Sequence, residues 1–183
     1  REQWWEDNGE YADDLAWAQK EFGIDQFRDY QWETAVLKRV VPIPLLVDAP
    51  TGSGKSLIAR LVLRRNGGLI LTADHALQAQ YAAGGIPSAT GKANWPCTIK
   101  PSVTAARAPC STGEIRSSAC DARQDGLCPY YNQVDIAEAS DVFVTNYHMW
   151  LNRWAGQHRY TVSDEAHRIE GILREWQTAQ VEF

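Results

Sequence analysis

The chain has 183 residues, of which 44% are hydrophobic and 22% charged, which is ordinary for a soluble globular protein. Its formal net charge of −5 gives no overall attraction to nucleic acid, although it leaves room for a local basic surface. No apolar run approaches the roughly 20 residues that a membrane span needs, and no signal segment begins the chain, so we expect no membrane partner and a cytoplasmic or nucleoid-associated protein, nuclear if eukaryotic.

The predicted elements begin with a helix in residues 3–23, where apolar and aromatic side chains recur at helical spacing and Gly23 can end the helix. Four later runs are almost continuously apolar and β-branched, as strands buried on both faces of a parallel sheet are. These predicted strands are residues 42–50, 67–74, 141–148 and 160–167, and predicted helices follow at residues 55–65, 75–83 and 167–177. The alternation of strand and helix predicts an α/β fold.

The periodic pattern fails between Gly84 and Asn132, a stretch rich in Gly, Ser, Pro and Ala. A loop of this length without a core of its own is improbable in a compact domain, so something other than hydrophobic burial should hold it. All four cysteines lie in it: Cys97, Cys110, Cys120 and Cys128. Persistent disulfides are rare in the cytosol, and soft thiolates select zinc or iron–sulphur clusters. Because no two cysteines form a close pair, we favour a [4Fe-4S] cluster, with zinc and free thiols as the alternatives.

The segment "APTGSGKS" stands where a predicted strand passes into a predicted helix, and it matches a phosphate-binding loop except for Ala in place of the first Gly. We expect it to bind ATP through Ala49, Pro50, Thr51, Gly52, Ser53, Gly54, Lys55 and Ser56. The ammonium of Lys55 would reach the β- and γ-phosphates, and the hydroxyl of Ser56 would ligate Mg²⁺. The alternative is a Gly/Ser turn that happens to precede a helix.

Two adjacent carboxylates end the last predicted strand, in "YTVSDEAH". Asp164 is a candidate ligand of Mg²⁺, Glu165 a candidate for polarising the attacking water, and His167 follows at the spacing of a DEAH box. The alternative is a helix N-terminus at which acidic side chains simply favour the helix dipole.

Taken in order, these motifs resemble the superfamily 2 DNA helicases, and most closely their iron–sulphur XPD/DinG branch. The segments that carry the resemblance are "FRDYQ", the phosphate-binding loop, "LILTADHALQAQY", "GKANWPC", "CPYY", "DVFVTNYHMWL" and the DEAH box. The resemblance implies a RecA-like P-loop NTPase domain in residues 1–83 and 135–183, interrupted by an iron–sulphur insertion in residues 84–134. It also implies adenine recognition by Gln31 and contact of the region of Thr72 with the DNA backbone.

The function implied by the resemblance is an ATP-dependent DNA helicase, with 5′→3′ polarity, ATP, Mg²⁺ and a [4Fe-4S] cluster as cofactors, and single-stranded DNA or a forked duplex as partner. A second motor domain, with the arginine that meets the γ-phosphate, is expected in a longer chain, so this part alone should hydrolyse ATP poorly. The rival interpretations are a P-loop ATPase or kinase without unwinding activity, and a zinc-stapled DNA-binding module.

The insertion differs in charge from the rest of the chain. Residues 84–132 contain five basic and three acidic side chains, for a net charge of +2. Together with nearby aromatic rings, these basic groups could follow a single strand of DNA, and Lys100 and Arg107 are the candidate contacts. The alternative is a solvated loop surface. His75, His148 and His158 show no ligand-like pattern, and we expect them to have ordinary structural roles.

Overall fold

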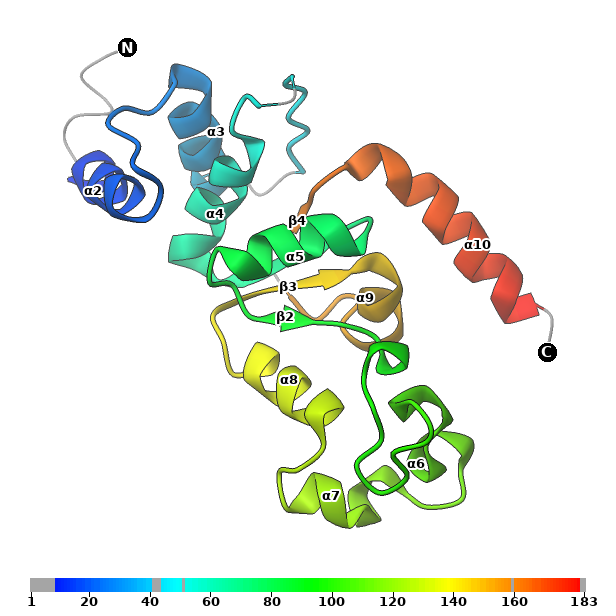
Figure 1. The fold of residues 1–183 in the computed structure, drawn as a ribbon. Coiled ribbons are helices and arrows are strands. Elements are labelled where there is room, and N and C mark those ends of the chain that lie inside the picture. The colour runs from blue at the N-terminus through cyan, green and yellow to red at the C-terminus, as the bar shows by residue number, and fades with distance from the viewer. Residues whose placement is uncertain (1–8, 41–43, 51, 159, 182–183) are drawn as a thin grey trace. The chain divides into compact units, whose positions relative to one another are not determined.

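The computed structural model describes residues 9–40, 44–50, 52–158 and 160–181. The chain divides into two compact units, Arg1–Asn66 and Gly67–Phe183. Figure 1 shows the helices and strands, coloured by residue number. The first unit carries the predicted phosphate-binding loop. The second carries the sheet, the cysteine-containing insertion and the DEAH box.

The described elements of the first unit are three helices: α2 (Glu10–Phe22), α3 (Asp29–Val40) and α4 (Lys55–Asn66). Helix α2 ends at Gly23, whose φ of 66° is the left-handed conformation that glycine adopts at helix ends, as the sequence predicts. Helix α4 begins at Lys55 and confirms the second predicted helix. Helix α3 was not predicted. It holds Trp32 stacked at 5.8 Å on Phe27, with both rings buried.

The predicted strand at residues 42–50 is not formed in the part that the structure describes. Residues 44–50 have no regular secondary structure, and the side chain of Leu46 is 87% exposed. An apolar run needs a neighbouring strand to become part of a sheet, and every element described in this unit is a helix. Residues 42–43 lie outside the described residues.

The second unit is built on a four-stranded, entirely parallel sheet with the order β2-β3-β1-β4. The strands are β1 (Gly68–Thr72), β2 (Ser88–Ala89), β3 (Val142–Asn146) and β4 (Thr161–Ser163). Three of them confirm predicted strands. The α/β class and the parallel sheet are therefore confirmed, whereas β2 lies in a segment that the sequence assigned to the insertion.

Helices cover both faces of this sheet. The chain crosses from β1 to β2 through α5 (His75–Ala83), and it returns in the opposite direction through α8 (Pro129–Glu138) and α9 (Tyr147–Arg153). Right-handed crossovers that run in opposite directions along a parallel sheet lie on opposite faces. In agreement, Leu69, Leu71 and Phe143 share one hydrophobic core with residues of α8 and α9. Helix α5, predicted from the sequence, lies on the other face.

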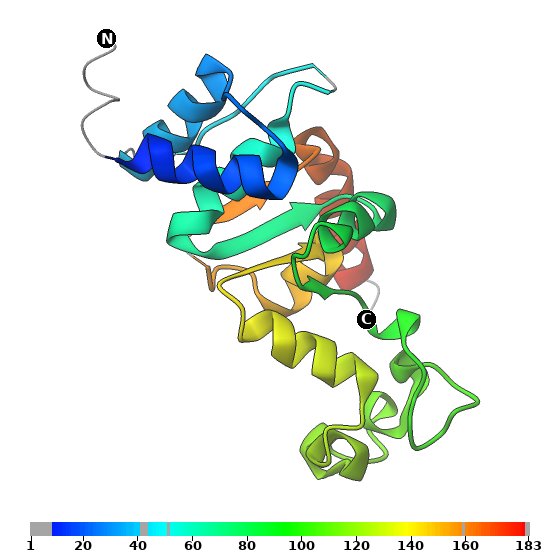
Figure 2. The same ribbon diagram turned by 60° about the vertical axis from the view of Figure 1, so that its left-hand side comes forward.

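The insertion between β2 and β3 is mostly irregular, as predicted. Its short elements are η1 (Lys92–Asn94), η2 (Ala105–Arg107), α6 (Pro109–Thr112), η3 (Ser117–Ala119) and α7 (Asp121–Gln124). Figure 2 shows them as a lobe joined to the sheet by α8 and by the segment after β2. The two ends of this lobe are fastened together by Gln133, whose side-chain amide accepts from the backbone N–H of Thr90 (2.8 Å) and donates to its carbonyl (2.6 Å).

After β4 the chain forms a short 3₁₀ turn, η4 (Ala166–Arg168), and the helix α10 (Ile169–Val181), which confirms the last predicted helix. Among the residues that the structure describes, no helix combines the length and the hydrophobicity of a membrane span.

Candidate functional site

The predicted phosphate-binding loop contains two glycines in the left-handed conformation. Gly52 has a φ of 76° and Gly54 a φ of 87°, which side-chain-bearing residues rarely adopt. A Cβ on Gly52 would meet no other atom within 4 Å, whereas a Cβ on Gly54 would overlap the side-chain nitrogen Nε2 of Gln31. Position 54 therefore requires glycine both for its backbone conformation and for the close approach of Gln31.

The ammonium of Lys55 lies over the loop. Its Nζ donates to the carbonyl oxygens of Ala49 (2.7 Å) and Pro50 (3.2 Å). Ser56 follows in the first turn of α4 and is partly exposed. Thr51 lies outside the described residues.

Three side chains of the segment 27–31 converge on one carbonyl of the loop. The oxygen of Ser53 accepts from Arg28 Nη1 (3.1 Å), from Gln31 Nε2 (3.1 Å) and from the hydroxyl of Tyr30. Gln31 is buried, and its Oε1 also accepts from the backbone N–H of Arg28 (3.0 Å). Gln31, predicted to recognise adenine, thus supports the conformation of the loop through its hydrogen bonds.

The DEAH box forms a tight turn at the carboxyl end of β4. The backbone N–H of Asp164 donates to the carbonyl of Leu71 in β1 (2.9 Å), so this turn continues the sheet. The carboxylate of Asp164 accepts from the hydroxyl of Tyr81 at Oδ2 (2.7 Å) and from the backbone N–H of Glu165 at Oδ1 (3.0 Å). Asp164 is therefore held in one orientation by groups on both of its oxygens.

Glu165 has a φ of 56°, and no other residue except glycine has a positive φ in the described chain. A left-handed conformation at such a residue costs free energy and often marks a functional turn. Glu165 is the N-cap residue of η4, but its side chain makes no capping hydrogen bond. Its Oε2 lies 3.2 Å from Nδ1 of His167, which is exposed.

The four cysteines, from four different segments of the insertion, line one pocket with about 310 Å³ of empty space, including the part open to solvent. Cys97 lies in a loop, Cys110 in α6, and Cys120 and Cys128 immediately before α7 and α8. Cys110 is partly exposed and the other three are buried. None of the four forms a disulfide. Within the described residues no three Cys, His, Asp or Glu side chains are already grouped around a single metal position.

The surroundings of this pocket suit four thiolates. Its wall contains Lys92 and no carboxylate among the described residues, and the backbone N–H of Lys100 lies 3.4 Å from the sulphur of Cys97. Tyr130 and Tyr131, in the first turn of α8 after Cys128, also line the pocket, and burial raises the pKa of Tyr130. A cation and an N–H donor favour negatively charged sulphur. The donor set therefore fits an iron–sulphur cluster or zinc.

A second, larger pocket adjoins the first and is here called the basic cleft. It has about 1100 Å³ of empty space, including the part open to solvent, and it shares Lys92, Tyr130 and Tyr131 with the cysteine pocket. His75, His148 and Arg153 are further lining residues. No described Asp or Glu lines the cleft, but the guanidinium of Arg153 is paired with the carboxylate of Glu138 at 2.9 Å.

The basic cleft was missed by the sequence reasoning, which gave His75 and His148 no role. The basic and aromatic side chains that line the cleft come from α5, η1, α8 and α9, and nothing in their spacing along the chain indicates that they lie close together. The only early signal was that α5 and α9 both begin directly after parallel strands, whose carboxyl ends share one edge of the sheet.

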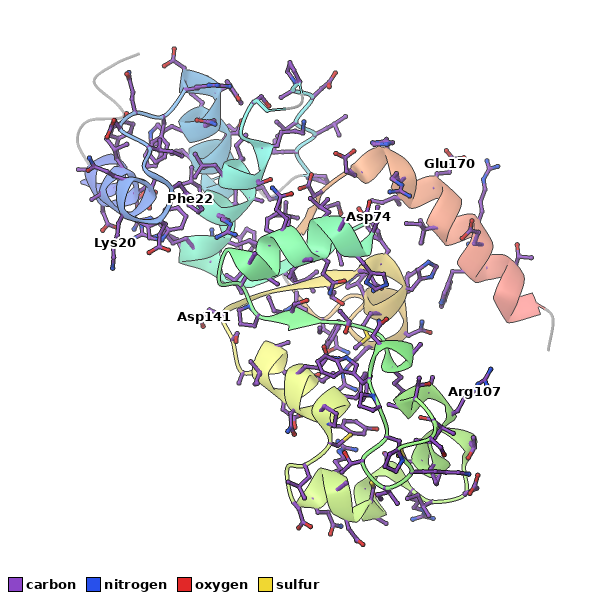
Figure 3. The ribbon with its side chains drawn as sticks, viewed as in Figure 1. Lys20, Phe22, Asp74, Arg107, Asp141 and Glu170 are labelled. Carbon is purple, nitrogen blue, oxygen red and sulfur yellow. The ribbon has the colours of Figure 1, made fainter. Side chains whose placement is uncertain are left out.

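The three predicted DNA contacts have different environments. Lys100 and Arg107 are exposed on the insertion, and Arg107 projects away from it (Figure 3). Thr72 is fully buried, and its hydroxyl lies 3.3 Å from the carbonyl of Asp74 and 3.4 Å from that of Thr145. The side chain of Thr72 therefore offers no exposed atom to a DNA strand.

Comparison with known proteins found no match to the chain among family models, curated proteins or solved structures.

Proposed function

We propose that this chain is the ATP-binding part of an ATP-dependent DNA helicase that carries a [4Fe-4S] cluster in an insertion of its RecA-like domain. The observation that carries the proposal is the meeting of all four cysteines in one pocket, beside a cleft lined by cationic and aromatic side chains. The 5′→3′ polarity rests on the resemblance of the sequence motifs alone.

The cluster would be held by Cys97, Cys110, Cys120 and Cys128, and it would supply a covalent cross-link among segments that share little hydrophobic core. Ordering each residue of the insertion costs about 1–2 kcal/mol of backbone entropy. The insertion has few large buried side chains of its own before Tyr130 to offset that cost. Metal binding and folding of the insertion are then one event.

For nucleotide binding, the backbone N–H groups around Gly52 and Gly54 and the ammonium of Lys55 would contact phosphates, and Ser56 would ligate Mg²⁺. Phosphate oxygens would replace the two loop carbonyls that Lys55 now contacts, because they carry a full negative charge. Asp164 would complete the Mg²⁺ shell, and Glu165 with His167 would orient the attacking water.

For nucleic acid, the basic cleft is the surface that fits best. Its cationic side chains suit phosphates, its asparagines can donate to sugars and bases, and Lys100 and Arg107 extend the same sign of charge over the insertion. Binding through the backbone of a single strand is expected to be sensitive to salt and largely independent of sequence.

The proposal is tested by measuring binding of a fluorescent ATP analogue with Mg²⁺, and of labelled oligothymidylate, to the same protein. We expect both ligands to bind, and Asn152→Asp, which places a carboxylate in the cleft, to weaken DNA binding without affecting the nucleotide.

The matched control is Gln157→Glu, which adds the same charge outside the cleft. Both side chains donate to a carbonyl four residues earlier at 2.7 Å, so the two substitutions perturb similar local contacts. Nucleotide binding without any DNA binding would favour the P-loop ATPase or kinase without unwinding activity. DNA binding without nucleotide binding would favour the non-enzymatic binding module.

A further inference from the structure

Helix α5 is tied to the DEAH turn at two points. At its start, Asp74 caps the helix by accepting from the N–H of Leu77 (2.9 Å), and its other oxygen lies 2.9 Å from Arg168 Nη1, just after the DEAH box. Two turns later, the hydroxyl of Tyr81 donates to Oδ2 of Asp164 (2.7 Å). Figure 3 labels Asp74 at the end of α5 that faces η4.

The hydrogen bond from Tyr81 joins a buried ring to a partly exposed carboxylate. Tyr81 is only 2% exposed, so its ring cannot leave the sheet face without losing packing. A phenol that donates to a carboxylate makes a charge-assisted hydrogen bond, which is stronger than one between neutral groups.

The hydrogen bonds of Asp164 show that Tyr81 restrains the orientation of its carboxylate. A carboxylate offers about four lone pairs, of which the N–H of Glu165 takes one on Oδ1 and Tyr81 takes one on Oδ2. One lone pair on each oxygen is then left for a metal ion or its waters. Without the phenol, rotation about the Cβ–Cγ bond would be restrained by the single contact at Oδ1.

We propose that Tyr81 is a positioning residue that orients the carboxylate of Asp164 for the Mg²⁺ ion of the bound nucleotide, a role that rests on the proposed function. Loss of a hydrogen-bond partner behind a metal ligand typically lowers metal affinity or activity by about 10- to 100-fold. Removal of the phenol hydroxyl is expected to have an effect in that range.

The test uses Mn²⁺ as a spectroscopic substitute for Mg²⁺. Electron paramagnetic resonance measures free Mn²⁺ during titration of the protein saturated with a non-hydrolysable ATP analogue. For Tyr81→Phe we expect about 10- to 100-fold weaker Mn²⁺ binding, while affinity for the analogue in the presence of a chelator stays unchanged.

The matched control is Tyr147→Phe. Tyr147 is also buried, at 2% exposure, and its hydroxyl lies 3.4 Å from the backbone carbonyl of Asp164 rather than from the carboxylate. We expect its Mn²⁺ affinity to change by less than about threefold, well below the loss expected for a partner of the metal ligand. Thermal unfolding of both variants shows whether each is folded at the titration temperature, so that a merely structural role of the hydroxyl is separated from a role in metal binding.

Asp164→Ala tests whether Asp164 binds the metal, separately from whether Tyr81 orients it. If it retains the Mn²⁺ affinity of the wild type, Asp164 is not the metal ligand and the assignment on which the inference depends fails. If Asp164→Ala loses Mn²⁺ while Tyr81→Phe binds it as tightly as Tyr147→Phe, the proposed function stands and the role of Tyr81 is refuted.

Discussion

Replacement of Gly54 by Ala should destabilise the nucleotide-free protein more than replacement of Gly52 by Ala. Both positions have a left-handed φ, which costs about 1–2 kcal/mol for a residue with a Cβ. Only at Gly54 would the new Cβ displace Gln31, whose amide makes two hydrogen bonds, to Ser53 and from Arg28. With about 0.5–1.5 kcal/mol for each, Gly54→Ala should cost about 2–5 kcal/mol against 1–2 kcal/mol for Gly52→Ala.

Urea unfolding without nucleotide, followed by far-ultraviolet circular dichroism, measures these losses. In a Gln31→Ala background the displaced hydrogen bonds are already absent, so Gly54→Ala should then cost only about 1–2 kcal/mol, leaving a coupling of about 1–3 kcal/mol. Equal losses for Gly52→Ala and Gly54→Ala, or additive losses for Gly54→Ala and Gln31→Ala, would refute the close packing of Gln31 against the loop.

Three further predictions concern nucleotide, DNA and the insertion. Lys55→Ala should weaken Mg²⁺-ATP binding by about 10- to 100-fold in calorimetry, because a charge-assisted contact with phosphate contributes about 1.5–3 kcal/mol. Reversing the charge of Lys100 and Arg107 together should lower DNA affinity and reduce the slope of log K against log salt by about 1.4, since each phosphate contact contributes about 0.7. Gln133→Ala removes both bonds to the backbone of Thr90 and should destabilise the attachment of the insertion by about 1–3 kcal/mol, seen as faster limited proteolysis within it.

Each of these variants has a control in the same chain. Lys20→Ala and Lys20→Glu change an exposed cation at the end of α2 and should leave both ligands unaffected. Gln124→Ala removes an exposed side-chain bond to Ser118 within the insertion and should leave the bonds that close its two ends intact. An equal response of control and test variant would contradict the assignment in question.

The sheet and its helices could be predicted where the pattern is local. The runs that became β1 and β3 each contain three consecutive apolar residues, 69–71 and 142–144, because both faces of a parallel sheet are covered, and the helix that begins at Lys55 follows from a glycine-rich loop. Residues 45–47 are also three consecutive apolar residues, but composition does not show whether a partner strand is available.

Contacts between segments that are distant in the sequence could not be predicted. The cysteines could be predicted to act together because thiols are rare and chemically distinctive. Tyr81 and His75 carry no such signature, and the contact of Tyr81 with Asp164 and the place of His75 in the cleft wall are seen only in the structure. Thr72 was assigned to DNA by its place in a motif, whereas it is buried like its neighbours in β1, because both faces of the parallel sheet are covered.

The most direct test of the account is the iron and acid-labile sulphide content of protein purified without oxygen. We expect brown protein with four irons and four sulphides per chain, as a [4Fe-4S] cluster held by four cysteines requires. Replacing Cys97, Cys110, Cys120 or Cys128 singly by Ser should bleach it and make the insertion sensitive to protease, while nucleotide binding persists. Colourless protein with one zinc per chain would refute the iron–sulphur cluster but would be consistent with a metal cross-link between the cysteines. Folded protein without any metal would refute both the cluster and the metal cross-link.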